Sequence, residues 1–172
     1  MIKNKPQDGW FSQRGFGMLL GKNFDDIDET TCQALIDAGA SESVHLEFKR
    51  ESYGKADEDK RELLKDVTAF ANTLGGYLII GIDEQGGAAS SIVPLSEIDV
   101  DQELQRLENI TRSSIEPLII GLRMKRIDVD GGSVIVIHIP RSFNPPTVLF
   151  LKTAIDIMLE IQREFMNCLL KS

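Results

Sequence analysis

Cysteine, histidine, tyrosine and tryptophan are scarce in this chain of 172 residues, which has two cysteines, two histidines, two tyrosines and one tryptophan. Cys32 and Cys168 lie far apart and outside any Cys-x-x-Cys motif, which excludes a zinc site built on cysteine pairs. We interpret both as free thiols in a reducing cytoplasm. No histidine stands where it would activate a serine or cysteine, so covalent hydrolysis is disfavoured.

Long hydrophobic runs are also missing. No stretch reaches the roughly 18 consecutive apolar residues of a membrane span, and the first residues lack the apolar core of a signal peptide. There is no GxxxxGK[ST] phosphate loop. The Gly75-Gly76 pair follows a predicted helix instead of preceding one, so we interpret it as a helix terminator and disfavour an ATP site. We therefore expect a cytoplasmic protein without a membrane segment.

Positive charge is in short supply. Lysine and arginine total 19 against 27 aspartates and glutamates, for a formal net charge of −8. Binding of nucleic acid across the whole surface is thereby disfavoured, because it needs basic residues gathered on one face. A local basic patch can still act, since salt screens each charge beyond about 10 Å.

The remaining composition is that of one ordinary globular domain, with 42% hydrophobic and 27% charged residues. The predicted order is helix, strand, helix, strand, helix, hairpin, helix, which indicates an α/β (α+β) single domain with a mixed β-sheet and packed helices. We divide the chain into an N-terminal tail or docking arm at residues 1–23, a domain at 24–150 and a C-terminal helix at 151–172.

Local patterns place the predicted elements. Asp28 caps a helix that runs to about Ala38, and another helix follows from Asp57. Alternation over residues 44–49 turns Val44, Leu46 and Phe48 toward a core. A strand covered on both faces is predicted at 77–82, and a helix capped by Asp99 ends near Ser114. A hairpin of strands 118–129 and 133–139 follows, with its turn at Asp130-Gly131-Gly132. A bulge is predicted where the alternation shifts near Lys125-Arg126.

Three stretches together resemble the Schlafen AlbA-like domain, also called a divergent AAA domain, over about residues 24–150. They are ESVHLEFK at 42–49, DVTAFANTLGGYLIIGIDE at 66–84 and IHIPRSFNPP at 137–146, of which the second is the most specific. The resemblance implies a DNA-binding or RNA-binding module with a regulatory or defence role. The arginine-bearing strand that usually follows the Pro-Pro pair in this family is not visible here.

In eukaryotic Schlafen relatives the resemblance also implies metal-dependent RNA cleavage by three acidic residues. Two of them correspond to Glu42 and Glu47, and the third matches Glu84, with Asp83 beside it. The implied cofactor is Mg²⁺ or Mn²⁺, with Glu42, Glu47 and Glu84 as its ligands. Here a glutamate stands where the family carries an aspartate.

The residues themselves support a site at this place. Glu47 and Lys49 share one face of a predicted strand, and Asp83 and Glu84 end another. If the two strands are neighbours, their carboxylates converge at one rim, where hard cations bind oxygen ligands. Lys49 would then stabilise charge on a phosphate. The alternative is a solvated polar face with a Glu47–Lys49 pair.

Basic residues form two groups. Lys49 and Arg50 belong to a first group that is interleaved with acids, for which a charge-paired surface is the alternative. The second group lies around the predicted hairpin and is less mixed with acids, which makes it the better candidate for phosphate contacts. Its members are Arg123, Lys125, Arg126 and Arg141.

The predicted C-terminal helix has too many apolar residues for one narrow stripe, so we expect it in the core or in a homodimer interface. Three functions remain open. They are a nucleic-acid-binding module, a metal-dependent endoribonuclease acting on structured RNA, and an interaction or oligomerisation domain without either activity.

Overall fold

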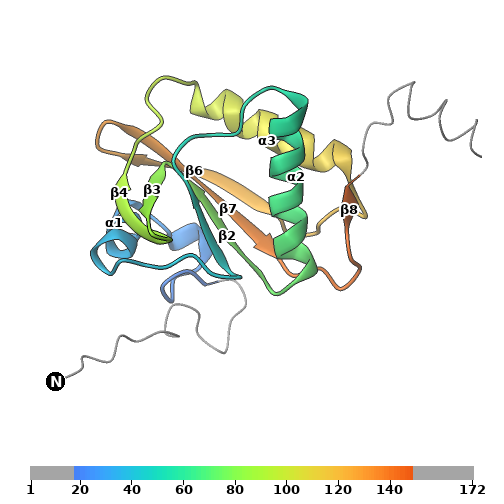
Figure 1. Cartoon of the computed structure of the whole chain (residues 1–172), viewed down its shortest axis with the longest axis horizontal. Coiled ribbons are helices and arrows are strands. Elements are labelled where there is room, and N and C mark those ends of the chain that lie inside the picture. Colours follow the sequence, from blue (N-terminus) through green and yellow to red (C-terminus); the bar gives the residue numbers. More distant parts are fainter. Residues whose placement is uncertain (1–17, 149–172) are drawn as a thin grey trace, which may run out of the picture.

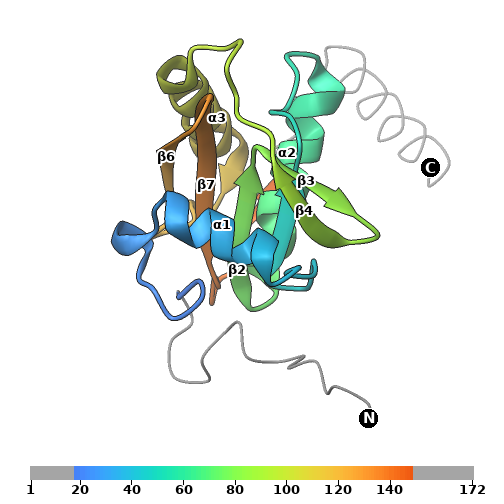
Figure 2. The ribbon, with the colours of Figure 1, turned by 90° about the vertical axis from the view of Figure 1, so that its left-hand side faces the viewer.

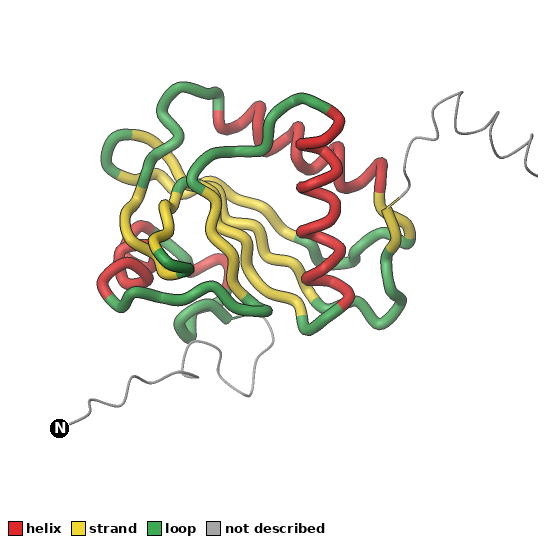
Figure 3. The backbone as a smooth tube through the Cα atoms, viewed as in Figure 1, coloured by secondary structure: helices red, strands yellow, loops and turns green. Residues whose placement is uncertain are grey.

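The computed structural model describes residues 18–148 and is built on a four-stranded sheet (Figures 1 and 3). The strands stand in the order β1 (Leu46–Lys49), β2 (Gly75–Ile80), β7 (Gly132–Pro140) and β6 (Arg123–Val129). β1 and β2 are parallel, and the other two pairs are antiparallel. The predicted mixed sheet with packed helices is therefore confirmed. Residues 1–17 of the predicted arm and the predicted helix at 151–172 lie outside the described residues.

Helices cover both faces of this sheet (Figure 2). The short helix η1 (Phe24–Asp26) and α1 (Glu29–Asp37) pack on one face, while α2 (Asp57–Asn72) and α3 (Val100–Ser114) pack on the other. Successive residues of a strand point to opposite faces, so β2 supplies alternate side chains to two cores. Within residues 18–148, no helix is both long and apolar enough to span a bilayer.

The predicted helices are confirmed at their caps. The Asp28 carboxylate accepts the Thr31 N–H at 3.0 Å at the start of α1. Asp99 accepts the N–H groups of Asp101 and Gln102 at 3.1 Å at the start of α3. These contacts satisfy N–H groups that have no partner inside the helix.

The doubly covered strand is confirmed as far as Ile80. Gly81 has φ +103°, and the chain there leaves the central sheet. It continues into a hairpin of β3 (Ile82–Gln85) and β4 (Ala88–Ile92), which pair with each other. The strand β4 was not predicted.

Two predictions near the strand starts are wrong. Val44 is 66% exposed, because a tight turn in which Ser43 and Leu46 exchange backbone hydrogen bonds delays β1 until Leu46. Gly75 and Gly76 do not terminate α2, which ends at Asn72, but open β2. Gly75 has φ +74°, and a Cβ there would lie 2.6 Å from the backbone nitrogen of Arg141. That close approach explains the glycine.

The predicted hairpin is present, but its first strand begins later and has no bulge. Residues 118–122 form no strand, and β6 pairs with β7 in unbroken register from Arg123 to Val129. The shift in alternation has another cause. Leu122 and Met124 pack with the α2–α3 core, whereas Ile127 and Val129 pack with the α1 core. The short pair of β5 (Ile115–Glu116) and β8 (Thr147–Val148) was not predicted.

Candidate functional site

Lys49 lies at the centre of a cluster of carboxylates between β1 and α2. Its Nζ atom is 2.7 Å from Glu62, 3.1 Å from Glu47 and 3.4 Å from Asp66. Glu47 and Lys49 share the β1 face that is turned toward α2, as the alternation predicted. Glu62 and Asp66 are four residues apart on α2, so both point to the strand. One ammonium group is therefore shared by three carboxylates, and the cluster keeps an excess of negative charge when all of them are ionised.

Tyr53 completes this cluster. Its phenol donates a 2.7 Å hydrogen bond to Asp66, and the Lys49 ammonium lies 5.6 Å from the centre of its ring. Burial, followed by the hydrogen bond to Asp66, raises the pKa of Tyr53. Burial, followed by the charge of Asp66, also raises the pKa of Glu47. Burial opposes the charge on Lys49, but hydrogen bonds to Glu62 and Glu47 outweigh it and raise the pKa of Lys49.

The other predicted acidic residues have different partners. The parallel pairing of β1 and β2 brings the strand ends together, and Arg50 forms a 2.8 Å ion pair with Asp83. Glu84 instead accepts the Gly87 N–H in its own hairpin turn. Glu42 accepts the Phe48 N–H at 3.0 Å. The structure thus brings Glu47 and Lys49 together and leaves Asp83 and Glu84 in separate contacts.

A metal centre is not assembled in this arrangement. Among residues 18–148, no three or more histidine, cysteine, aspartate or glutamate side chains group as a metal ion requires. Glu42, Glu47 and Glu84 are each engaged by other groups of the protein. In these contacts the three carboxylates do not fit Mg²⁺ or Mn²⁺.

Most of the basic residues predicted to bind phosphate make internal contacts. Arg123 pairs with Asp25, and Lys125 donates to the backbone oxygen of Ile27 at 2.7 Å. Arg126 lies 2.9 Å from Asp101 and 3.0 Å from Asp128. These three residues hold the 24–28 segment and the start of α3 against β6. Carboxylates therefore offset the charges of Arg123 and Arg126, while Lys125 is held by backbone carbonyls.

Arg141 differs from the other members of its group. It is exposed and has no ion pair among the described residues, and its guanidinium carbon lies 5.6 Å from the centre of the Phe143 ring. Phe143 is 93% exposed. Phe143 was not predicted from the sequence. The pattern that could have indicated its exposure is an aromatic residue between an arginine and an Asn-Pro-Pro turn. The pair presents a cation and a flat apolar surface side by side.

The loop that carries this pair, Arg141–Pro146, is anchored to the end of α2. The Ser142 N–H donates to the Ala71 carbonyl at 2.8 Å, and the Asn72 side chain donates to the Pro146 carbonyl at 3.2 Å. Inside the loop, the Ser142 hydroxyl donates to the Asn144 carbonyl at 2.6 Å. The loop is thereby ordered by contacts that involve neither Arg141 nor Phe143.

The three stretches that carry the family resemblance meet beside this loop. A ring nitrogen of His45 lies 2.9 Å from the Gly75 carbonyl, and Gly76 packs against the His45 backbone with no room for a side chain. Gly75 in turn lies against Arg141. The glycine pair and the Asn72 amide therefore join one end of the sheet to the anchored loop.

The chain belongs to the Schlafen AlbA_2 family, whose model matches residues 42–163, more than half of its length. Similar solved structures include the N-terminal domain of the "Putative ATP-dependent DNA Helicase RecG-related Protein" from Nitrosomonas europaea, with 20% identity over 71% of this chain and 80% of that one and a TM-score of 0.53. That likeness confirms the fold. The DIP2311 protein from Corynebacterium diphtheriae matches at 22% identity over 70% of this chain and 24% of its own, with a TM-score of 0.44.

Proposed function

We propose that this domain binds single-stranded nucleic acid, RNA or DNA, through the Arg141–Pro146 loop. The observation that carries the proposal is the exposed Phe143 ring beside an Arg141 that has no ion pair among the described residues. Aromatic side chains stack on unpaired bases, and arginine contacts the backbone phosphates or stacks as well. Membership of the Schlafen AlbA_2 family supports a nucleic-acid role.

The charge distribution defines the kind of binding. Arg123, Lys125 and Arg126 already have partners, and the chain carries a net charge of −8, so few phosphates can be neutralised. The affinity will therefore be modest, with a shallow dependence on salt. A stacking contact is tolerant of sequence, because every base has an aromatic face. We accordingly propose an accessory module in a regulatory or defence protein.

Fluorescence anisotropy with labelled single-stranded RNA and DNA, at two salt concentrations, tests this proposal. Phe143→Ala should weaken binding by about fivefold to 150-fold, since stacking contributes about 1–3 kcal/mol per base. Arg141→Ala should weaken binding and reduce the salt slope. Val44→Ala, which truncates another exposed apolar side chain, is the matched control. Equal affinities for the wild type and Phe143→Ala would refute the proposal.

A metal-dependent endoribonuclease acting on structured RNA is the second candidate, and it would require Glu42, Glu47 and Glu84 to exchange their present partners for the metal. The observation that favours it is the Glu47 carboxylate, whose pKa is raised and which lies beside Lys49. Perturbed carboxylates of this kind gather at functional sites. The test is incubation of transfer RNA with Mg²⁺ or Mn²⁺, comparing the wild type with Glu47→Ala and with the exposed control Glu97→Ala. Absence of metal-dependent cleavage by the wild type removes this candidate.

An interaction or oligomerisation domain is the function that would remain after both tests failed. Neither nucleic-acid binding nor RNA cleavage would then be measurable with the folded wild-type chain. The homodimer predicted from the C-terminal helix belongs to this third possibility, and its measurement is the molar mass of the full chain in solution.

A further inference from the structure

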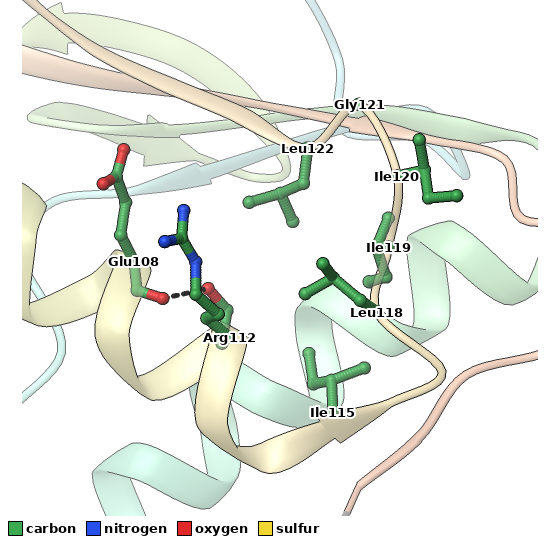
Figure 4. Close-up of a pocket in the computed structure, with 9 residues that line it drawn as sticks. Glu108, Arg112, Ile115, Leu118, Ile119, Ile120, Gly121 and Leu122 are labelled. Atoms are coloured by element: carbon green, nitrogen blue, oxygen red, sulfur yellow. Dashed lines mark hydrogen bonds between the residues drawn. The ribbon is translucent and has the colours of Figure 1, made fainter.

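An apolar groove of about 290 Å³ lies between the C-terminal half of α3 and residues 118–122 (Figure 4). Ile115, Ile119 and Leu122 contribute aliphatic side chains to it, and Glu108 and Arg112 stand on the α3 side. The groove is distinct from both the Lys49 cluster and the Arg141–Pro146 loop. Its lining combines aliphatic side chains with the charged Glu108 and Arg112 at one margin.

Two large aliphatic side chains of this groove face solvent in the described part of the chain. Leu118 is 56% exposed and Ile120 is 89% exposed, although only one residue separates them. Removing such apolar area from water is favourable in rough proportion to the area buried. Neighbouring exposed apolar residues of this kind mark a candidate interaction surface.

The path of the chain points to the segment that covers it. β8 pairs antiparallel with β5, and this pairing sets Val148 directly opposite Ile115, which lines the groove. Paired residues lie about 5 Å apart between Cα atoms. The described part of the chain therefore ends at Val148, beside the groove.

The chemistry of residues 149–172 matches this position. Large apolar residues recur along the segment at spacings of three and four, as on one side of a helix. They include Leu151, Ile155, Met158, Leu159, Phe165, Met166, Leu169 and Leu170. The family match runs to residue 163, so much of this segment belongs with the matched domain.

We propose that residues 149–172 of the same chain cover the groove with their apolar side chains. A tether that starts at the groove gives the segment an effective concentration in the millimolar range, which favours it over a separate molecule. The groove is thus occupied by residues 149–172 of the same chain. Coverage by the same segment of a second copy is the alternative that the experiments distinguish. The proposal is independent of the nucleic-acid role of the Arg141–Pro146 loop.

Limited trypsin digestion of the full chain, followed by mass spectrometry, tests the proposal. Cleavage after Lys152 and Arg163 should be slow in the wild type. It should be at least tenfold faster in Leu118→Ser/Ile120→Ser and unchanged in Val44→Ser, a control that removes an exposed apolar side chain elsewhere. Equal rates in all three proteins would overturn the proposal. Protection that disappears on dilution of a dimer would also overturn it, in favour of a second copy.

A second measurement avoids the risk that the double variant fails to fold. A nitroxide is attached to Ile120→Cys in a Cys168→Ser background, where the remaining Cys32 is fully buried. Amide signals of residues 149–172 should broaden within the labelled chain. The absence of broadening would overturn the proposal. Broadening only when a spin-labelled chain is mixed with an isotope-labelled one would also overturn it, in favour of a second copy.

Discussion

The phenol of Tyr53 donates a 2.7 Å hydrogen bond to the Asp66 carboxylate, which itself lies 3.4 Å from the Lys49 ammonium. Tyr53→Phe removes the donor and leaves the ring in place. We expect a loss of about 1 kcal/mol in the free energy of unfolding, because Asp66 retains Lys49 as a partner. Urea denaturation measures this loss. An unchanged unfolding midpoint would mean that the hydrogen bond contributes nothing.

Lys49→Met should be more damaging. It leaves Glu47, Glu62 and Asp66 facing one another without a cation, and we expect a loss of about 1–3 kcal/mol at neutral pH. Lys60→Met is the matched control, because the Lys60–Asp57 pair is exposed and such pairs contribute little. Similar losses in the two variants would contradict a special role for the cluster.

The raised pKa of Glu47 predicts a dependence of stability on pH. A carboxyl whose pKa is raised by folding costs stability once it ionises, so the cost is absent below its unfolded value, about 4.3, and complete above its higher folded value. Glu47→Gln should therefore be at least as stable as the wild type at pH 7, and should lose any advantage near pH 4. Unfolding curves at both pH values test this. Glu62→Gln, which removes a more exposed partner of Lys49, should give no such advantage.

His138 predicts a loss of stability as the pH falls, whereas Glu47 predicts a loss as the pH rises. Burial, followed by the charge of Arg123, lowers the pKa of His138, and its Nδ1 atom is buried without a hydrogen-bond partner among residues 18–148. The folded state thus disfavours protonation, so stability is complete above about pH 6.5 and is lost as the pH falls toward the lower folded value. The His138→Gln variant should lack this loss. Thermal denaturation between pH 7.5 and 5.5 compares the two proteins, and parallel curves would contradict the assignment.

Gly75→Ala should disturb both the fold and the Arg141–Pro146 loop. Gly75 has φ +74°, and a Cβ there would lie 2.6 Å from the Arg141 nitrogen and 2.7 Å from the Ile139 oxygen. The backbone conformation alone costs about 1–3 kcal/mol, and the clash adds to it. Gly86→Ala is the control, because Gly86 also has a positive φ but no atom within 4 Å of a Cβ. We expect Gly75→Ala to lose more stability than Gly86→Ala and to bind nucleic acid more weakly.

The helices were predictable because their signals are local. Asp28 and Asp99 cap the helices that follow, and the apolar spacing of α2 defines its buried face. The start of β1 was not predicted, because the turn from Ser43 to Leu46 contains no glycine, proline, asparagine or aspartate to signal it. The loop at 118–122 was not predictable, because tertiary contacts set it. A two-residue ladder such as β5–β8 is too short to show a period.

The candidate site was predicted only in part, for the same reason. The alternation of β1 placed Glu47 and Lys49 on one face, as the structure shows. The choice of Glu62, Asp66 and Tyr53 as their partners depends on how α2 packs against β1, which no local pattern reveals. Whether an arginine is free or paired depends in the same way on tertiary contacts.

The Glu42 carboxylate accepts a hydrogen bond from the Phe48 N–H, which points away from the sheet. Phe48 lies on β1, an edge strand of the sheet. The neighbouring outward N–H, that of Leu46, is occupied by the Ser43 carbonyl. A strand with free N–H groups at the margin of a sheet is a template for pairing with another molecule. The Glu42 carboxylate therefore blocks pairing of another strand at this edge. Its replacement should make the chain more prone to self-association into fibrillar aggregates.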